Sequence, residues 1–405
     1  MSTTLPALGR QHAEIVRATL PLVGAHIDEI TDVFYRGLFD RHPELGRDLF
    51  NRTDQAAGSQ PRALAASIAR FAARLVDPAA PQPDAMLARI GHKHASLGVT
   101  AGQYEVVHEH LFAAIGAVLG AEVVTEPVAA AWDRVYWLMA DALIEQENRL
   151  YTRAGAAPGA VFREAVVVAR DEDPAGVAVF TVESADPARP LPGFTPGQYI
   201  SVAGRLPDGA RQLRQYSLLG PAEGGRLMFA VKRVDGEPGF PAGEVSTWLY
   251  RHIAPGDTLT LTLPFGDVTV DPAATTALVL ISAGIGIAPM IAILEQLASD
   301  APHRRVLLAH ADRSPHAVPL RARLLELVPR LPALTLEFHY SEHGTGAHFT
   351  VNPGALDLPA NADFLLCGPT GFLTTVRAAL REHGIPDARI RTEQFTPTDW
   401  REGTA

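Results

Sequence analysis

The chain has 405 residues, of which 47% are hydrophobic and 20% are charged, and its formal net charge at pH 7 is −10. This composition is typical of a globular protein, and the length predicts more than one domain. The acidic balance argues against a nucleic-acid-binding surface, and the single cysteine, Cys367, excludes an intrachain disulfide and any zinc or iron–sulfur site built from several thiolates.

Residues 1–152 are predicted to form an all-helical domain. Apolar residues recur at helical spacing in three stretches, and Pro or Gly residues come after each of the first two. The three stretches contain Ile27, Ile30, Phe34, Leu38 and Phe39, then Leu64, Ile68, Phe71 and Leu75, then Trp132, Tyr136, Met139 and Leu143. The Ala- and Gly-rich segment at 154–159 is typical of a linker.

Beyond the linker the pattern becomes that of β-strands. Strands are expected at 165–169, 177–182, 227–232 and 258–263, with residues 171–176 as the turn between the first two. From about residue 275, strands expected at 277–281, 305–310, 334–338 and 363–367 alternate with helical segments. This alternation predicts a parallel sheet covered on both faces, so we expect three domains: all-α over 1–152, β over 153–267 and α/β over 268–405.

His94 is the strongest candidate for a metal ligand in the helical domain. One helical stripe contains this histidine together with Leu87, Ile90 and Leu97. His92 points away from that stripe, among polar neighbours. His94 is therefore expected to project into an apolar surface, as an axial ligand of a buried haem must. The alternative is a hydrogen-bonded histidine of an ordinary core.

Two residues are candidates for hydrogen-bonding this histidine. Tyr104 comes after a helix break at Gly98, and Glu147 lies on the last helix of the domain. A carboxylate that accepts the second ring N–H makes a ligating imidazole a stronger electron donor to iron. The alternative is that Glu147 is solvated on a polar face, as is expected for Glu145.

The opposite side of such a site would contain Tyr35, Phe50, Gln60 and Leu64. Because Phe34 and Tyr35 are adjacent and face different directions, only one of the two is expected to be buried. A tyrosine hydroxyl above the iron would hydrogen-bond O2, with help from Gln60. For each of these residues taken singly, the alternative is an ordinary core position.

The helical domain resembles the globin domain of flavohaemoglobins. The residues that carry the resemblance are Phe34-Tyr35, His42-Pro43-Glu44-Leu45, Leu49-Phe50-Asn51, Gln60, Lys93-His94-Ala95-Ser96 and Gln103-Tyr104. It implies that the domain binds haem b. The implied roles are proximal iron ligand for His94, support of that ligand by Tyr104 and Glu147, a distal pocket of Tyr35 and Gln60, contact with the haem for Phe50 and Leu64, and tuning of the redox potential by Lys93.

Arg214-Gln215-Tyr216-Ser217 is the candidate flavin-binding segment of the β domain. Arginine pairs with a pyrophosphate, tyrosine flanks a flat isoalloxazine ring, and a serine hydroxyl can bond near flavin N5. An exposed strand edge is the alternative. Tyr199 precedes this segment, and Val245 and Ser246 lie where a loop enters a helix, a natural site for the pyrophosphate. Together these features resemble the FAD domain of ferredoxin reductases.

Gly284-Ile285-Gly286-Ile287-Ala288-Pro289 is the candidate loop for NAD(P)H. Its glycines allow a phosphate to approach the backbone closely, and Pro289 suits a first helical turn. The pattern is not Gly-x-Gly-x-x-Gly, but it resembles the pyridine-nucleotide loop of the same reductases. Ile287 and Ala288 stand where flavohaemoglobins commonly have Gln-Thr, so only a backbone role is expected to survive there.

Two further segments resemble parts of the same family. Cys367-Gly368-Pro369 ends the last core strand and resembles the nicotinamide-side loop; a purely structural cysteine is the alternative. Glu393 and Phe395 resemble the pair found between flavin and haem. Phe395 would cover the isoalloxazine ring until nicotinamide displaces it, and Glu393 would tune redox potentials together with Lys93.

The resemblance implies a nitric oxide dioxygenase that uses NAD(P)H, FAD and haem to convert NO and O2 to nitrate. Two alternatives remain: a haem reductase acting on peroxides or other acceptors, and a sensor or storage globin whose reductase only maintains ferrous iron. We expect a cytoplasmic monomer with small-molecule partners, because the sequence shows neither a secretion signal nor an apolar run long enough for an integral membrane segment.

Overall fold

The computed structural model describes residues 8–52, 55, 58–220, 224–236, 242–341 and 350–395. The chain divides into two compact units. Unit 1 contains residues 8–161 together with Pro207–Leu213, and unit 2 contains Phe162–Leu206 and Arg214–Phe395. In the described ranges, no helix is long and apolar enough to cross a membrane.

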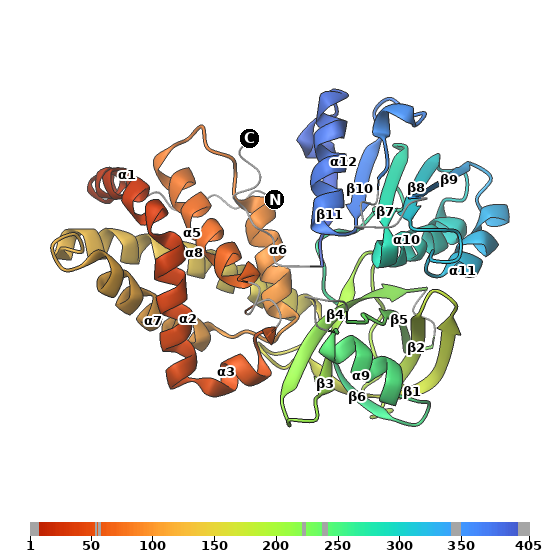
Figure 1. Cartoon of the computed structure of the whole chain (residues 1–405), viewed down its shortest axis with the longest axis horizontal. Helices are drawn as coiled ribbons and strands as arrows, with labels where there is room; N and C mark the ends of the chain where they lie inside the picture. Colours follow the sequence, from red (N-terminus) through yellow and green to blue (C-terminus); the bar gives the residue numbers. More distant parts are fainter. Residues whose placement is uncertain are drawn as a thin grey trace. The chain divides into compact units, whose positions relative to one another are not determined.

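Unit 1 is built from α-helices, as predicted (Figure 1). Apolar side chains of α2, α5, α6, α7 and α8 form one hydrophobic core, and the three predicted helical stretches lie in α2, α5 and α8. The helices are α1 (Arg10–Ala25), α2 (Ile27–Arg41), α3 (Pro43–Asp48), α5 (Ser59–Val76), α6 (Asp84–Ala95), α7 (Ala101–Leu119) and α8 (Glu126–Arg153).

The connection from α6 to α7 brings two predicted site residues close together in the chain. Helix α6 ends at Ala95, and Gly98 adopts a left-handed φ of 73°, a conformation that glycine adopts without steric cost. Helix α7 then starts with a capping box in which the backbone N–H of Thr100 donates to Gln103 Oε1 at 2.8 Å. Tyr104 therefore lies in the first turn of α7, just after His94 in the last turn of α6.

Unit 2 contains most of a closed antiparallel barrel with the strand order β1-β2-β5-β4-β3-β6. Helix α9 (Glu244–His252) packs Val245 and Leu249 into the barrel core. Strand β1 pairs up to Asp173 with Val177, so the turn predicted over 171–176 is shorter than expected. The strands are β1 (Phe162–Asp173), β2 (Val177–Ser184), β3 (Tyr199–Arg205), β4 (Arg211–Leu219), β5 (Arg226–Lys232) and β6 (Thr258–Thr262).

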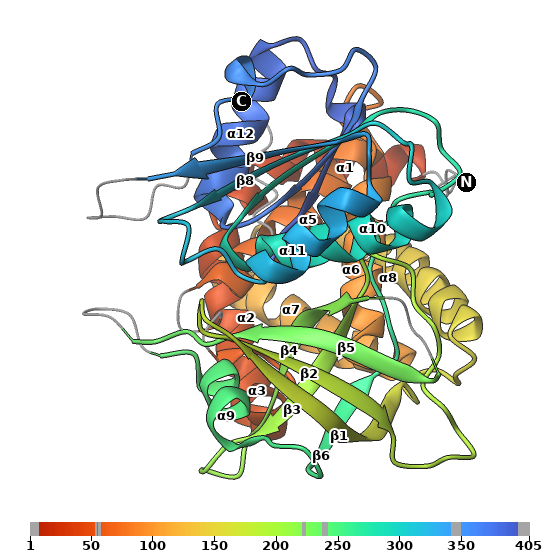
Figure 2. The same cartoon turned by 90° about the vertical axis from the view of Figure 1, so that its right-hand side faces the viewer.

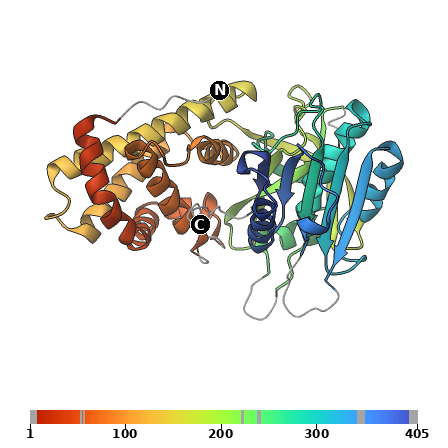
Figure 3. The same ribbon diagram turned by 90° about the horizontal axis from the view of Figure 1, so that it is seen from above.

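The second sheet of unit 2 is parallel, with the order β11-β10-β7-β8-β9. Leu278 and Leu280 of β7 pack into the core with α10 and α11, whereas Val279 and Ile281 pack with α12. Helices α10 and α11 thus cover one face of the sheet and α12 covers the other (Figures 2 and 3). The elements are β7 (Leu278–Ala283), α10 (Ile287–Asp300), β8 (Val306–Asp312), α11 (Arg321–Leu327), β9 (Leu334–Tyr340), β10 (Asp363–Cys367), α12 (Thr370–Glu382) and β11 (Ile390–Glu393). The predicted sheet with helices on both faces is confirmed.

The predicted fold class is confirmed, whereas the predicted domain limits stay predictions. The barrel strands and the parallel sheet fall largely in one compact unit, so the structure has two units where the sequence predicts three domains. A short 3-10 turn, η1 (Gly284–Gly286), connects β7 to α10. Similar short turns are η2 (Val328–Arg330), η3 (Pro353–Ala355) and η4 (Asp387–Arg389).

Candidate functional site

His94, Tyr104 and Glu147 form one hydrogen-bonded group in unit 1. His94 Nδ1 lies 2.9 Å from Glu147 Oε1 and 2.9 Å from Tyr104 Oη. The phenol of Tyr104 donates to Glu147 Oε1 at 2.6 Å. Glu147 is only 1% exposed, which rules out the alternative of a solvated carboxylate, whereas Glu145 is exposed and pairs with Arg149 at 2.8 Å.

The electrostatics of this group fix which atom donates. Burial raises the pKa of Tyr104, and the Glu147 carboxylate raises it further, so the phenol keeps its proton. Glu147 Oε1 is then the shared acceptor, and His94 donates to it from Nδ1–H. This tautomer leaves the lone pair on Nε2, the nitrogen that would bind iron. Tyr136 Oη donates to the carbonyl oxygen of Tyr104 at 2.6 Å and so holds the backbone of α7 in place.

The surroundings of His94 fit an axial ligand of haem. Its side chain is 31% exposed, and none of the described residues hydrogen-bonds Nε2. Leu87 is buried and Ile90 is partly buried on the same helix, as the predicted stripe requires. Leu97 lies beyond the end of α6 at Ala95, so the prediction that it continues the helical stripe is wrong. Lys93 is exposed beside this histidine.

Tyr35 and Phe34 are both buried, at 7% and 2% exposure, so the expectation that only one of them is buried is wrong. Helix α2 contacts both α5 and α7, so a wider part of its surface is buried than a single apolar stripe would predict. Burial raises the pKa of Tyr35, and a hydrogen bond with Gln55 opposes that shift. The phenol is therefore a proton donor at ordinary pH.

Gln55 contacts both predicted distal residues, Tyr35 and Gln60, and the sequence did not reveal it. Its Nε2 donates to Gln60 Oε1 at 2.9 Å, so Gln60 is linked to Tyr35 through Gln55. Gln55 lies five residues before Gln60 in the sequence, but this spacing does not show which of the two glutamines contacts Tyr35.

Aromatic rings surround Tyr35. The ring of Phe50 lies 5.8 Å from that of Tyr35 and 5.3 Å from that of Phe39, and both contacts are edge-to-face. Phe50 and Leu64 are only partly buried at the edge of the core, which fits walls of an apolar ligand pocket. Within unit 1, the buried amide of Gln212 donates to the carbonyl oxygen of Phe50 at 3.1 Å and holds this segment.

The segment predicted to bind flavin lies on β4, inside the closed barrel, so the alternative of an exposed strand edge is ruled out. Tyr216 Oη is buried and has no hydrogen-bond partner among the described residues, while burial raises its pKa. A buried hydroxyl without a partner costs free energy, so a ligand with an acceptor at this position, as flavin has, fits the site. Gln215 Nε2 donates to Ser201 Oγ at 2.9 Å, and Ser217 is nearly buried.

The other predicted flavin residues lie on three elements of unit 2. The side chain of Val245 is buried against Gly204: its Cγ1 lies 3.0 Å from the position that a Cβ on Gly204 would take. Only the backbone of Val245 is therefore available to a ligand. Ser246 Oγ bonds weakly to the carbonyl oxygen of Gly243 at 3.4 Å. Phe395, just after β11, is 44% exposed. The roles of these residues stay predictions, as do those of Tyr199, Arg214, Gln215, Ser217 and Glu393.

The two predicted nucleotide loops are in direct contact. A Cβ built on Gly286 would lie 2.3 Å from the carbonyl oxygen of Cys367, which no side chain could tolerate. Packing of η1 on the end of β10 therefore requires glycine at this position, while the role of Gly286 in the approach of a phosphate stays a prediction. A Cβ on Gly368 would similarly lie 2.9 Å from the ring of Phe372. Cys367 itself is fully buried, and Pro369 caps α12.

The side chains that start α10 belong to the core. Ile287, Ala288 and Pro289 are buried, and the first two pack in the hydrophobic core under the sheet. Only the backbone groups of these residues are therefore available to a nucleotide, as was expected for Ile287 and Ala288. Lys232, at the end of β5, was missed by the sequence analysis: its Nζ lies 3.9 Å from the Cβ position of Gly284. Burial lowers the pKa of this lysine.

Together, a helical domain with a hydrogen-bonded histidine suited to bind haem iron, and a barrel followed by a parallel sheet, define the class of haem- and flavin-dependent oxidoreductases. Family comparison agrees: residues 32–143 match the globin family, and residues 280–378 match the oxidoreductase NAD-binding domain. The flavohemoprotein of Rhizobium meliloti (strain 1021) is 37% identical over 407 residues, covering 96% of this chain and 98% of the relative. That of Chromobacterium violaceum is 36% identical with the same coverage. The chain belongs to the flavohemoprotein family.

Solved structures give the same result. The crystal structure of a flavohemoglobin from Malassezia yamatoensis with bound FAD and heme is 35% identical, with a TM-score of 0.86, and covers 96% of this chain and 100% of its own. The flavohem-like FAD/NAD-binding domain of nitric oxide dioxygenase from Vibrio cholerae O1 biovar El Tor is 30% identical, with a TM-score of 0.51, over 57% of this chain and 98% of its own. The predicted family and its cofactor set of haem, FAD and NAD(P)H are confirmed at the level of the family.

Proposed function

We propose that this flavohemoprotein is an NAD(P)H-dependent nitric oxide dioxygenase. In the balanced reaction, two NO and two O2 take up the two electrons of one NAD(P)H and leave as two nitrate ions, with NAD(P)+ and one proton. The similar FAD/NAD-binding domain from a nitric oxide dioxygenase supports the same reaction here. When bound, haem supplies the iron at which the gases react, and FAD relays the electrons of NAD(P)H.

The single observation that carries the proposal is the hydrogen bonding of His94. Glu147 Oε1 lies 2.9 Å from its Nδ1 and also accepts from Tyr104 at 2.6 Å, and both Glu147 and Tyr104 are buried. The carboxylate draws the Nδ1 proton and makes Nε2 more basic, so His94 would hold iron as an electron-rich ligand. This ligand and a reductase in the same chain fit repeated turnover of O2 better than reversible storage.

Tyr35 is the residue that we expect to hold the gaseous substrate. Its buried phenol keeps its proton, because burial raises its pKa. Tyr35 Oη would donate this proton in a hydrogen bond to a substrate oxygen, while Gln55 and Gln60 orient the phenol. The rings of Phe39 and Phe50 would keep water away from the reacting atoms.

In unit 2, we expect the guanidinium of Arg214 and the N-terminus of α9 to hold the pyrophosphate of FAD. The unpartnered hydroxyl of Tyr216 would hydrogen-bond the flavin, and Phe395 would cover the ring until nicotinamide displaces it. The backbone of η1, with the nearby ammonium of Lys232, would bind NAD(P)H.

The test uses purified protein loaded with haem and FAD. NO consumption is measured with an electrode in the presence of O2 and NADH, and nitrate is quantified at the end. We expect two nitrate ions per NADH consumed. Absence of NADH-dependent nitrate above the rate without protein would contradict the proposal. A parallel run with H2O2 replacing NO tests peroxide reduction, for which the same basic axial ligand is suited; faster NADH use there would favour that activity instead.

A further inference from the structure

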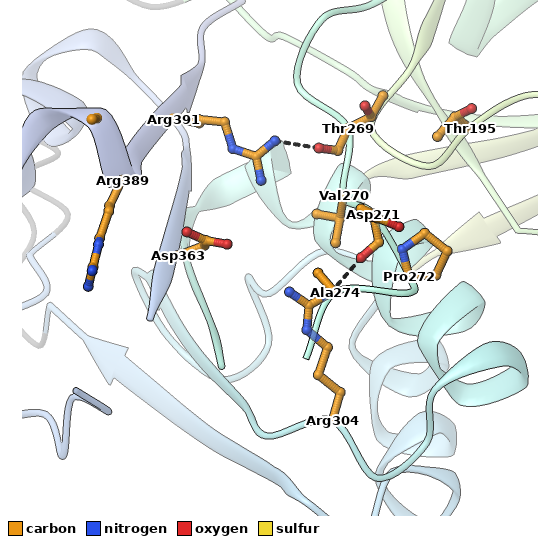
Figure 4. Close-up of a pocket in the computed structure, with 11 residues that line it drawn as sticks. Thr195, Thr269, Val270, Asp271, Pro272, Ala274, Arg304, Asp363, Arg389 and Arg391 are labelled. Atoms are coloured by element: carbon orange, nitrogen blue, oxygen red, sulfur yellow. Dashed lines mark hydrogen bonds between the residues drawn. The ribbon is translucent and has the colours of Figure 1, made fainter. Parts of the chain in front are cut away.

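Unit 2 contains a pocket at the edge of the parallel sheet opposite the nucleotide loops (Figure 4). Its residues lie where strands begin: Asp363 is the first residue of β10, Arg304 comes just before β8, and Arg391 is the second residue of β11. The nucleotide loops come after the other ends of β7 and β10, so the pocket lies at the opposite edge. Its volume of about 510 Å³ is within the range of small-molecule sites.

Backbone carbonyl oxygens orient two arginines of this pocket. Arg304 is only 8% exposed and donates from Nε to the carbonyl oxygen of Thr276 and from Nη1 to that of Asp271, both at 2.9 Å. Arg391 Nη1 donates to the carbonyl oxygen of Thr269 at 2.5 Å. Carbonyl oxygens orient a guanidinium but carry no formal charge. Among the described residues, neither arginine forms an ion pair within 4.0 Å.

The remaining charged groups narrow down what the pocket can hold. Three arginines and two aspartates line it, so the lining has a positive excess of one charge (3 − 2). Asp363 Oδ2 accepts from Thr276 Oγ1 at 3.1 Å, and its carboxylate lies between the Arg391 and Arg304 side chains in Figure 4. Arg389 bonds Asn361 Oδ1 at 3.2 and 3.3 Å, and its guanidinium extends away from the other two. Arg304 and Arg391 are therefore the charges available to a ligand.

We propose that this pocket binds a small phosphate ester that carries hydroxyl groups, with its phosphoryl group on Arg304 and Arg391. A guanidinium has five N–H donors, and the carbonyl bonds use two on Arg304 and one on Arg391, so donors remain for paired bonds to phosphate oxygens. Asp363 repels a bare anion but accepts hydrogen bonds from hydroxyl groups. The combination favours a sugar phosphate over inorganic phosphate.

The test uses the full-length protein loaded with haem and FAD, with saturating NAD+ present so that the dinucleotide site is occupied. The probes are ribose 5-phosphate, inorganic phosphate and ribose, and binding is measured by isothermal titration calorimetry. We expect saturable binding of ribose 5-phosphate, weaker binding of inorganic phosphate and none of ribose. No saturable binding of ribose 5-phosphate, or equal binding of ribose, would overturn the proposal.

Variants test the assignment of residues. Arg391→Gln removes one of the two available guanidinium groups, and we expect the Kd for ribose 5-phosphate to rise about tenfold. The matched control is Arg305→Gln, because Arg305 is the exposed neighbour of Arg304 and pairs with Asp357 instead; its Kd is expected to be unchanged. Equal affinity in Arg391→Gln and the unmodified protein would overturn the assignment.

A second variant, Asp363→Asn, tests the same pocket if Arg391→Gln does not fold. Asp363→Asn removes the repulsion of a bare anion, so inorganic phosphate is expected to bind more tightly while ribose 5-phosphate gains little. The preference for the ester therefore shrinks. An unchanged ratio of the two Kd values would mean that Asp363 does not face the ligand, and would overturn the assigned pose.

Discussion

Glu147 accepts hydrogen bonds from His94 and Tyr104 at the same carboxylate oxygen, and we expect its charge to affect the haem iron through His94. We expect Glu147→Gln to raise the reduction potential of the bound haem, because the neutral amide no longer draws the Nδ1 proton of His94. NO turnover should fall by about tenfold to a hundredfold, the usual cost of losing such a partner. Potentiometric titration of the haem and the rate of nitrate formation check both effects.

The control for this variant is Glu145→Gln, on the same helix but exposed and paired with Arg149. Neither the potential nor the turnover is expected to change there. If Glu147→Gln lowers turnover but leaves the haem potential at its original value, Glu147 acts only by holding the fold.

Tyr35 tests the distal side independently. We expect Tyr35→Phe to lower NO turnover by about tenfold to a hundredfold, since one charge-assisted hydrogen bond to the substrate is lost. Reduction of the flavin by NADH should proceed at the original rate. Stopped-flow spectroscopy separates the two processes. Tyr151→Phe is the control, because it removes another phenol of unit 1, which donates to the carbonyl oxygen of Val99. If Tyr35→Phe slows flavin reduction as much as it slows NO turnover, Tyr35 has a structural role.

At the scale of elements, periodicity predicted the helices of unit 1 and the strands of the parallel sheet, because each buries a regular face. The same reasoning found His94, whose neighbours share that face. It failed where several elements converge: both Phe34 and Tyr35 are buried because α2 has two neighbours. Gln55 and Lys232 reach their sites through the tertiary fold, and no local pattern in the sequence marks such positions.

Packing requires glycine at position 286, whether or not the loop also binds a phosphate. We expect Gly286→Ala to destabilise unit 2 by about 1–3 kcal/mol, because the new methyl group would lie 2.3 Å from the carbonyl oxygen of Cys367. Thermal unfolding monitored by flavin fluorescence measures the change. Gly371→Ala on α12 is the control, since nothing lies within 4 Å of its Cβ position; similar losses in both variants would argue against the packing explanation.

Strand β8 contains a buried histidine, His310, from which we expect a response of stability to pH. His310 Nδ1 lies 2.9 Å from Ser282 Oγ, and its Nε2 lies 3.8 Å from Asp312 Oδ2. Burial lowers the pKa of His310 below its ordinary value of 6.5, although Asp312 opposes this shift, while Lys232 and His339 reinforce it. Below pH 6.5 the unfolded chain therefore binds this proton before the folded chain does.

The free energy of unfolding of unit 2 is consequently expected to fall as the pH drops from 6.5 towards the lowered pKa, by at most about 1.4 kcal/mol per pH unit. Urea unfolding at a series of pH values measures the slope. His310→Asn should flatten it, whereas His303→Asn, at an exposed position, should not. A slope in His310→Asn equal to that of the unmodified protein would assign the acid sensitivity to another group.

At the scale of the whole molecule, the hydrogen-bonded group of His94, Tyr104 and Glu147 belongs to unit 1, and the nucleotide loops belong to unit 2. In the proposed reaction, unit 2 supplies electrons to unit 1. A defect in one unit should therefore be bypassed when electrons are supplied from outside, which makes the two sites separable by experiment.

Lys232 provides this test. Its Nζ is 3.9 Å from the Cβ position of Gly284, so Lys232→Met removes a positive charge at the proposed nucleotide loop while keeping the length of the side chain. We expect the KM for NADH in flavin reduction to rise about tenfold, the effect of one charge-assisted bond to phosphate. NO turnover at low NADH should fall in proportion, yet return to normal when the flavin is photoreduced. If photoreduction does not restore NO turnover, Lys232 affects a step other than NADH binding, which would contradict this prediction.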